Sequence, residues 1–420
     1  MTTKLSIKEN KFLINGNLTY SELPNCNEKY YGLLMNSRMI QGIFDDASEP
    51  ERFNRYGKIF SPDTNTEEFI KALPQWYAHG IRAVTVGFQG GGPCFTINNH
   101  TIDNTAFSND GLSMKQAYLD RMEKVIKAAD EIGMIVIVSY FYGAQTRFIE
   151  NDLAIINSVK TASNWLRDKA FTNVIIEIAN EHDVPDFKIH PIVYTPSGVA
   201  TLIDIAKRES GGMPVGCSGM GGTFSDVIAN ASDVILIHAN GQNKQKFYNL
   251  IQKAKAIKPA RPIVCNESSQ ALSQIPVAMN EYVSWGYYNN MTKQEPPTYW
   301  EILDGEDKFF AYRVSEYVGI ATPKLALEEQ FYIQGLEEHM VYDGKRFLRL
   351  ASLYPEKIMY VEFFRNGKYV MSAYDDPFMM NSVGCNWRQD PFTEEIIKGE
   401  VWSAKIHLID GNTVEISTTV

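Results

Sequence analysis

The stretch that decides the predicted fold is Asn173-Val174-Ile175-Ile176-Glu177-Ile178-Ala179-Asn180-Glu181. Its β-branched apolar run is typical of a parallel strand that is covered on both faces. The apolar run stops at Asn180 and Glu181, so we expect the strand to end there. Ligand sites of α/β folds lie at the carboxyl ends of the strands, and these two side chains are therefore candidate site residues.

A second stretch has the same design. Residues 261–267 read Arg-Pro-Ile-Val-Cys-Asn-Glu, another short apolar run that closes on Asn-Glu. Because parallel strands end at the same edge of a sheet, Glu181 and Glu267 are predicted to form a carboxylate pair.

Composition limits the function classes. The chain has 420 residues and a mass of 47.5 kDa, for which two domains are the natural expectation. A net charge of −10 argues against nucleic acid or an anionic membrane as the main partner, and favours a neutral one. No uncharged apolar run approaches the roughly 20 residues of a membrane span. The N-terminus lacks the apolar core of a signal peptide, so the protein is expected in the cytoplasm, or is exported with its signal removed.

The chain has five cysteines, which are scattered and show no Cys-x-x-Cys spacing: Cys26, Cys94, Cys217, Cys265 and Cys385. This pattern predicts neither a disulfide framework nor a zinc site. Cys265 precedes Glu267 by two residues, but a small core residue is the preferred interpretation over a catalytic thiol.

Strands and helices alternate over roughly 290 residues. The predicted strands are Gly32–Met35, Ala83–Phe88, Ile135–Tyr140, Val174–Ile178, Pro214–Cys217, Val234–Ile237, Ile263–Cys265 and Val283–Tyr287. The clearest predicted helices are Glu67–His79, Met114–Ile132, Asp152–Asp168, Val199–Glu209 and Lys244–Ile257. Eight such units predict an α/β fold, a (β/α)8 TIM barrel. A doubly wound open sheet is the alternative, but the first strand is followed by Asn36-Ser37-Arg38 and lacks the glycine-rich turn.

Both ends of the chain have a different pattern. The first thirty residues predict a β-hairpin, and hairpin signals after Phe331 predict a small all-β sandwich. The expected domains are residues 1–30, the barrel over 31–328 and the sandwich over 329–420. In the sandwich, Asp375, Asp376, Trp387 and Arg388 are candidates to reach over the barrel mouth, although packing is the preferred role.

The ordered motifs resemble the retaining glycoside hydrolases of clan A, which include the family-five cellulase-like enzymes. In that clan an Asn-Glu pair ends strand 4 and a second Glu ends strand 7, as Asn180-Glu181 and Glu267 do here. Further matches are an Arg on strand 1, a His on strand 6 and an aromatic residue on strand 8: Arg38, His238 and Trp285. Strand 6 reads His238-Ala239-Asn240 and lacks the usual Tyr after the His, so the family and part of the site stay open.

The resemblance implies a chemistry for these residues. Cleavage of a glycosidic bond needs an acid for the leaving oxygen and a carboxylate for the oxocarbenium-like carbon. Glu181 would be the acid/base and Glu267 the nucleophile, kept ionised with help from Arg38. Asn180 would bind the sugar 2-hydroxyl. The implied partner is a carbohydrate, and no cofactor or metal is implied.

Weaker candidates surround these residues. Gln89, Tyr142, His238 and Asn240 are further candidate substrate contacts, since each follows or ends a predicted strand. The cluster of His182, Asp183, Asp186 and His190 fits no standard metal spacing, so a metal site is not favoured there. Two hypotheses remain: a retaining β-glycosidase, and a non-hydrolytic carbohydrate-binding or inactivated barrel.

Overall fold

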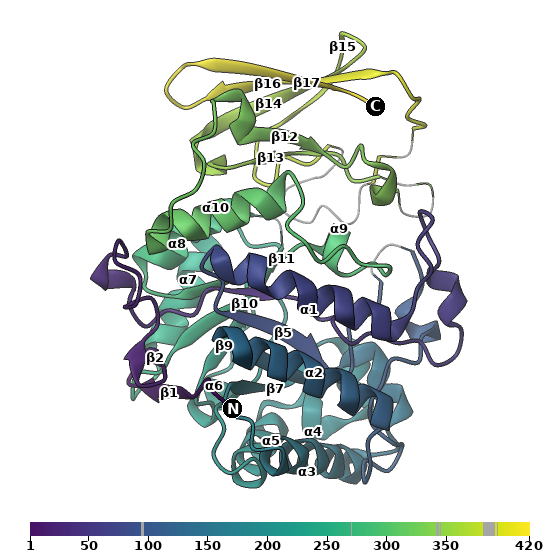
Figure 1. Cartoon of the computed structure of the whole chain (residues 1–420), viewed down its shortest axis with the longest axis vertical. Coiled ribbons are helices and arrows are strands. Elements are labelled where there is room, and N and C mark those ends of the chain that lie inside the picture. Colours follow the sequence, from purple (N-terminus) through teal and green to yellow (C-terminus); the bar gives the residue numbers. More distant parts are fainter. Residues whose placement is uncertain (94–95, 270, 342–343, 345, 381–390, 393) are drawn as a thin grey trace.

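The computed structural model describes residues 1–93, 96–269, 271–341, 344, 346–380, 391–392 and 394–420. Its centre is a sheet of eight parallel strands in the order β8-β7-β6-β5-β4-β11-β10-β9 (Figure 1). The strands are β4 (Asn36–Arg38), β5 (Ala83–Gly87), β6 (Ile135–Tyr142), β7 (Val174–Asn180), β8 (Val215–Gly216), β9 (Ile235–His238), β10 (Ile263–Ser269) and β11 (Ser284–Tyr288). This order is that of a (β/α)8 barrel, and the predicted fold class is confirmed.

The two end strands of the sheet, β8 and β9, complete the ring. The backbone N–H of Asp233 donates to the carbonyl of Val215 over 2.8 Å, just before β9 begins. A Cβ on Gly216 would lie 2.3 Å from the carbonyl oxygen of Val234, so a side chain larger than hydrogen has no room there. Close backbone contact therefore closes the barrel at this seam, although no regular ladder joins the two strands.

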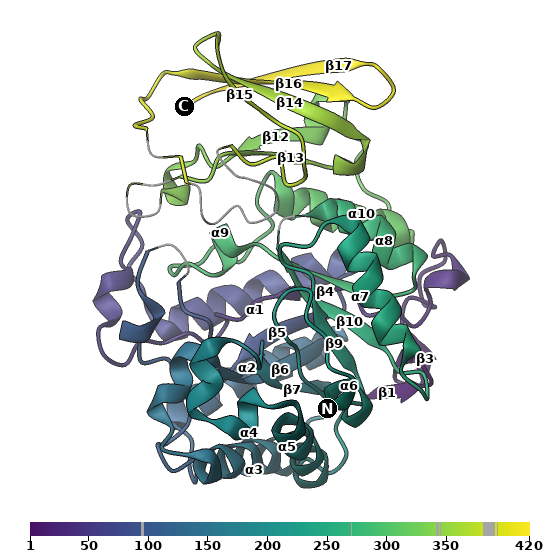
Figure 2. The same cartoon turned by 180° about the vertical axis from the view of Figure 1, so that it is seen from behind.

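Helices surround the strands (Figures 1 and 2). They are α1 (Pro62–Ala78), α2 (Gln116–Ile132), α3 (Asp152–Asp168), α4 (Pro191–Tyr194), α5 (Pro196–Glu209), α6 (Asp226–Ala231), α7 (Lys244–Ala256), α8 (Ile275–Asn280), α9 (Asn290–Lys293) and α10 (Glu306–Val318). Local signals set their ends: Asn151 caps α3 through the N–H of Ala154, and Gly133 ends α2 in the left-handed conformation. Among the described residues, no helix is long and apolar enough to cross a membrane.

The first barrel strand lies later in the chain than predicted. We expected Gly32–Met35, whereas β4 spans Asn36–Arg38. All three residues of β4 are polar and buried, with Ser37 donating to the carbonyl of Tyr287. A search for apolar runs cannot find such a strand, because none of its side chains is apolar.

The N-terminal hairpin is confirmed as β1 (Leu5–Lys8) and β2 (Lys11–Ile14), extended by β3 (Asn17–Leu18). Leu5 and Phe12 pack in one apolar cluster with residues at the beginnings of the barrel strands, among them Ala83 and Ile135. The hairpin therefore covers the amino-terminal end of the barrel, opposite the end where Asn180 and Glu181 lie.

The C-terminal part is all β, as predicted. A two-stranded sheet, β12 (Phe331–Gln334) and β13 (Arg349–Ser352), faces a four-stranded sheet with the order β15-β14-β16-β17. The latter strands are β14 (Ile358–Arg365), β15 (Lys368–Ala373), β16 (Val401–Leu408) and β17 (Thr413–Thr419). Side chains of both sheets share one apolar core, which makes a small sandwich next to α10 (Figures 1 and 2). Trp387 and Arg388 lie outside the described residues.

Candidate active site

Most of the predicted site residues meet in one small pocket at the carboxyl ends of the barrel strands. The pocket is lined by Arg38, Ile40, Tyr142, Asn180, Glu181, Asn240, Glu267, Tyr288, Asn290 and Gln294. Six of these were candidates from the sequence, and they come from β4, β6, β7, β9 and β10 or from the residues that follow them.

The two glutamates form a close pair. One carboxylate oxygen of Glu181, one of Glu267 and a ring nitrogen of His238 all lie within 4.8 Å of one another. The side chain of Glu181 is 19% exposed and that of Glu267 is 8% exposed, so both carboxylates reach the pocket surface. Glu181 follows β7 directly and has a left-handed φ of 52°, a conformation that is uncommon for a residue other than glycine.

Glu267 is held by two donors. Nε of Arg38 lies 2.7 Å from its Oε2, and Nδ2 of Asn240 donates to its Oε1 over 2.5 Å. Asn240 therefore makes a contact to the second carboxylate at the position where the resembling enzymes have a Tyr two residues after the strand-6 His. A charged and a neutral donor on one carboxylate both favour its ionised form.

Glu181 is held differently. Its Oε1 lies 3.1 Å from Nδ1 of His238, while its backbone N–H donates to Oγ of Ser218 over 3.2 Å. Nδ1 of His238 is also 3.8 Å from Oε2 of Glu267, so this ring nitrogen lies between the two carboxylates. The guanidinium of Arg38 contacts Glu267, whereas the imidazole of His238 makes the closest contact to Glu181, so the two glutamates have unlike surroundings.

A third glutamate lies below the pair and was missed in the sequence. Glu177, in the middle of β7, is completely buried and contacts Arg38 (3.4 Å), Ser218 (2.8 Å) and Asn266 (2.8 Å). Burial opposes its ionisation, but Arg38 and His238 outweigh burial and lower the pKa of Glu177. The sequence did hold a signal for Glu177, because a charged residue within an apolar strand needs a buried partner of opposite charge.

The buried cation is Arg38. Its guanidinium contacts Glu267 and Glu177 and also donates to Oδ1 of Asn180 over 2.7 Å. Burial alone would lower the pKa of Arg38, but the carboxylates around it, Glu177 foremost, raise it. One side chain thus fixes three candidate site residues, a task suited to the rigid fork of a guanidinium.

The imidazole of His238 responds to the same charges. Burial favours the neutral ring, yet the carboxylates of Glu267 and Glu181 raise the pKa of His238 above its ordinary value.

Three candidate substrate contacts do not line the pocket: His238 is fully buried against the two glutamates, and Trp285 and Gln89 lie away from it. Trp285 is fully buried and packs on Phe310 of α10, because its side chain points to the helix layer. Side chains alternate between the two faces of a strand, so Gly286 and Tyr288 face the barrel interior. Tyr288 lines the pocket, and Trp285 does not. The prediction that Trp285 faces the pocket is therefore wrong, and the alternation of side chains along the strand would have indicated Tyr288 at this position.

Gln89 is the second correction. Its side chain is fully buried, with Nε2 donating to Thr105 over 2.9 Å and Oε1 accepting from the backbone N–H of Tyr142 over 3.0 Å. Both ends of the amide bind protein groups, so Gln89 positions the chain at Tyr142 and does not face a substrate. Tyr142 itself is half-buried and lines the pocket.

Metal-ligating side chains gather only at the carboxylate pair, as far as the described ranges go. Glu181, His238 and Glu267 are the one group of that kind found there. The loose cluster after β7 is dispersed: Asp183 accepts from the N–H of Met220, Asp186 contacts His100, and His190 contacts the carbonyl of Thr146. Cys265 is buried, and burial raises the pKa of its thiol to about 12, so it is no nucleophile at neutral pH.

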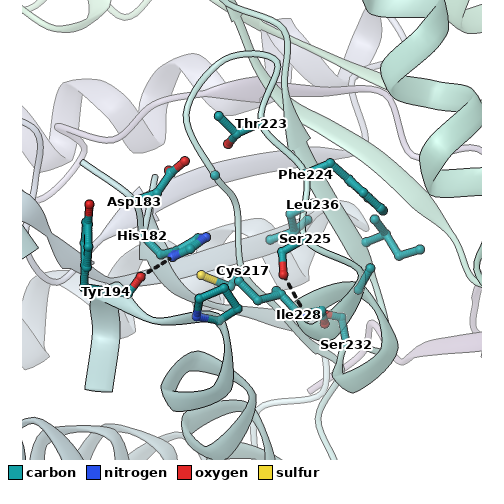
Figure 3. A pocket seen from close by; sticks show the side chains of 14 residues that line it. His182, Asp183, Tyr194, Cys217, Thr223, Phe224, Ser225, Ile228, Ser232 and Leu236 are labelled. Atoms are coloured by element: carbon teal, nitrogen blue, oxygen red, sulfur yellow. Dashed lines mark hydrogen bonds between the residues drawn. The ribbon is translucent and has the colours of Figure 1, made fainter. Parts of the chain in front are cut away.

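A separate pocket of about 310 Å³ lies beside the barrel seam (Figure 3). His182 and Asp183 from the segment after β7 face Thr223 and Phe224 from the segment after β8 across it. His182 contacts the carbonyl of Tyr194 over 3.2 Å, and burial lowers the pKa of its imidazole. The neighbouring Cys217 has a thiol whose pKa is raised well above normal by burial, so this thiol is no nucleophile at neutral pH.

The fold is a (β/α)8 barrel with a pair of carboxylates at the carboxyl ends of its strands. Residues 44–187 match the model of the cellulase family, glycosyl hydrolase family 5. The match includes Asn180 and Glu181 and ends before Glu267. It confirms, over this part of the chain, the resemblance to the family-five cellulase-like barrels of clan A.

Among solved structures, the chain is similar to three β-glucuronidases. These are the enzyme of Parabacteroides merdae (12% identity, TM-score 0.43), β-glucuronidase 2 of Bacteroides uniformis (10%, 0.45) and the FMN-binding β-glucuronidase of Facaelibacterium prausnitzii L2-6 (11%, 0.45). The similarity covers 99%, 100% and 99% of this chain but 50%, 48% and 58% of those chains, respectively. The chain thus spans about half the length of these three structures. No curated protein matches it.

Proposed function

We propose that the protein is a retaining β-glycosidase that hydrolyses O-glycosidic bonds of an oligo- or polysaccharide by double displacement. The observation that carries this proposal is the carboxylate pair, whose nearest oxygens lie within 4.8 Å. Retaining enzymes place their two carboxyl groups about 5–5.5 Å apart, whereas inverting enzymes need about 6.5–9.5 Å to admit a water molecule. The close pair therefore favours retention.

In the first step, Glu267 attacks the anomeric carbon and Glu181 gives its proton to the departing glycosidic oxygen. The C–O bond to the leaving group breaks as the ester bond to Glu267 forms. Arg38 and Asn240 support this role of Glu267, because both donors stabilise the carboxylate before the attack. The proton lost by Glu181 leaves a carboxylate next to Nδ1 of His238, which is placed to donate to it.

In the second step, Glu181 takes a proton from water, the hydroxide oxygen attacks the anomeric carbon, and the bond to Glu267 breaks. Glu267 returns to the carboxylate form between Arg38 and Asn240. The raised pKa of His238 supports this exchange, since the imidazolium offsets whichever of the two glutamates carries the charge. The hydrogen bonds are in place before the reaction and need little rearrangement.

Asn180 is the proposed contact to the sugar 2-hydroxyl. Its Oδ1 accepts from Arg38, so its Nδ2 group is the part that would donate to a substrate oxygen. A hydrogen bond at this position strengthens as positive charge develops on the ring in the transition state. Tyr142 and Tyr288 are proposed to border the sugar, since both line the pocket.

The purified protein should first be tested on a panel of aryl β-glycosides that differ in the sugar. We expect turnover of at least one, with the β-anomer as the first product in a proton NMR time course. Glu267→Ala should abolish turnover, whereas Glu131→Ala, which replaces an exposed carboxylate, should not. An α-anomer as first product would overturn retention. Sugar binding without turnover on any member would favour the non-hydrolytic alternative.

A further inference from the structure

A second crevice lies between the barrel and the sandwich, with a volume of about 370 Å³. On the barrel side it is lined by the segment from Gly241 to Lys246, at the start of α7, and by Ser273. On the sandwich side it is lined by Tyr374 and Asp375, which follow β15. The sandwich therefore supplies one wall of a crevice whose other wall begins one residue after Asn240.

Neighbouring residues of one segment line the crevice and the carboxylate pocket. Asn240 lines the pocket and donates to Glu267, and Gln242 lines the crevice two residues further along the chain. Gln274 fixes this segment, because its Nε2 donates to the carbonyls of Gln242 (2.7 Å) and Ala239 (3.2 Å). The segment that follows β9 therefore contributes to both the pocket and the crevice.

The aromatic wall of the crevice is exposed yet held in place. Tyr374 is 66% exposed, and its ring stacks on Tyr360 with centroids 5.2 Å apart and planes 20° apart. Tyr360 stacks in turn on His407, at 4.1 Å and 11°. Nε2 of His407 lies 2.8 Å from a carboxylate oxygen of Glu362, which anchors the end of the stack. Three parallel rings thus present the open face of Tyr374 without the usual mobility of an exposed side chain.

The junction between the two parts is also tied at the crevice. A carboxylate oxygen of Asp376 accepts from the backbone N–H of Ser273 over 3.0 Å. Ser273 belongs to the segment that follows β10, the strand that carries Glu267. This contact holds the tyrosine wall at a fixed position relative to the carboxylate pocket.

The composition of the crevice matches a neutral polyhydroxylated chain. The negative face of an aromatic ring attracts the C–H groups of a sugar ring, which carry partial positive charge. Hydroxyl groups both donate and accept, and the walls offer both functions: Lys244 and Lys246 are exposed donors, and Asp375 is an exposed acceptor. The mixed signs disfavour a strongly charged ligand of either sign.

We propose that this crevice binds part of an oligosaccharide chain beyond the carboxylate pocket, with the ring of Tyr374 as the stacking platform. The inference rests on the proposed glycosidase function and adds that the sandwich takes part in substrate recognition. It predicts that affinity grows with the length of the saccharide until the chain reaches Tyr374.

The experiment compares wild type, Tyr374→Ala, Tyr374→Phe and Tyr369→Ala. Tyr369 is the matched control, since it is 58% exposed on the same strand pair but lies at the far turn of the β14–β15 hairpin. The probes are an aryl β-glucoside and β-1,4-linked gluco-oligosaccharides of two to six units. We expect Tyr374→Ala to raise KM for the longest chain about tenfold more than KM for the aryl glucoside. Tyr374→Phe should restore the wild-type ratio, and Tyr369→Ala should not change it.

Binding measured by calorimetry in a Glu267→Ala background separates this inference from the proposed function. If wild type hydrolyses aryl glycosides but Tyr374→Ala binds the six-unit chain as tightly as its parent, the crevice inference is wrong and the glycosidase proposal stands. If no aryl glycoside is hydrolysed, a loss of oligosaccharide binding in Tyr374→Ala alone supports the crevice as a binding site. Failure of the parent to bind any of the oligosaccharides overturns the inference.

Discussion

Nε of Arg38 lies 2.7 Å from Oε2 of Glu267, which joins the first strand of the barrel to the seventh. The same buried guanidinium contacts Glu177 and Asn180 on the fourth strand. A cation inside the barrel thereby holds the proposed nucleophile, the proposed 2-hydroxyl ligand and a buried carboxylate at fixed positions. The proposed roles of Glu181, Glu177 and Glu267 can therefore be tested with separate substitutions.

Glu181→Ala should affect substrates according to their leaving groups. A good aryl leaving group needs little protonation, so kcat/KM should fall far less for a dinitrophenyl glycoside than for an alkyl glycoside. Azide, as a small external nucleophile, should restore part of the turnover and give a β-glycosyl azide. Equal losses on both substrates, without azide rescue, would contradict the role of Glu181 as the acid/base.

Glu177→Gln tests the buried carboxylate. Removing one partner from a buried charge cluster typically costs about 3–5 kcal/mol, so the free energy of unfolding should fall by about 3 kcal/mol at pH 7. Because the pKa of Glu177 is lowered in the folded protein, its contribution is present above the unfolded pKa near 4.5 and is lost as pH falls through the folded pKa. Denaturant titrations of both proteins from pH 7 to pH 3 should therefore converge in acid. A constant difference at all pH values would count against an ionised Glu177.

His238 should titrate above the ordinary histidine value of 6.5. Its stabilising contribution is then present below pH 6.5 and disappears as pH rises through the folded pKa. The imidazole resonance of His238, assigned by comparison with His238→Gln, should have its midpoint above 6.5. Glu267→Gln should move the midpoint down, since it removes the carboxylate that contributes most to the rise. A wild-type midpoint below 6.5 would show that burial outweighs the carboxylates.

A chain that ends at Leu327 should be poorly soluble. Ala351 and Leu353, at the end of β13, belong to the same apolar cluster as the barrel core. Arg313 of α10 also contacts Glu356 of the sandwich over 2.8 Å, a partner that truncation would remove. Size-exclusion chromatography and thermal melting would check this. A soluble, cooperatively folded truncated chain would mean that the barrel does not depend on the sandwich.

The fold was predictable because apolar runs marked seven of the eight barrel strands and turn residues marked the hairpins. The polar strand β4 escaped for a physical reason: its buried polar side chains are satisfied by residues far along the chain, such as Tyr287. A pattern of neighbouring residues in the sequence cannot indicate hydrogen-bond partners that lie so far along the chain.

The candidate site was predictable where a polar residue follows an apolar run, as Asn180 and Glu267 show: both line one pocket. Side-chain direction decided the failures. Trp285 and Tyr288 lie three residues apart on β11 and point to opposite faces, so only the alternation along the strand separates a core residue from a pocket residue. The burial of Gln89 depends on Thr105 and on the backbone of Tyr142, which one sequence cannot position.

The central claim is that Glu267 forms a covalent bond to the sugar. The most direct measurement is mass spectrometry of the protein after incubation with a 2-deoxy-2-fluoro β-glycoside that carries an activated leaving group. The fluorine slows the second step more than the good leaving group slows the first, so the ester accumulates. We predict a mass increase of one fluorosugar, located by peptide fragmentation on Glu267 and absent from Glu267→Ala. Labelling of any other residue, or turnover of the parent glycoside by Glu267→Ala, would contradict the account.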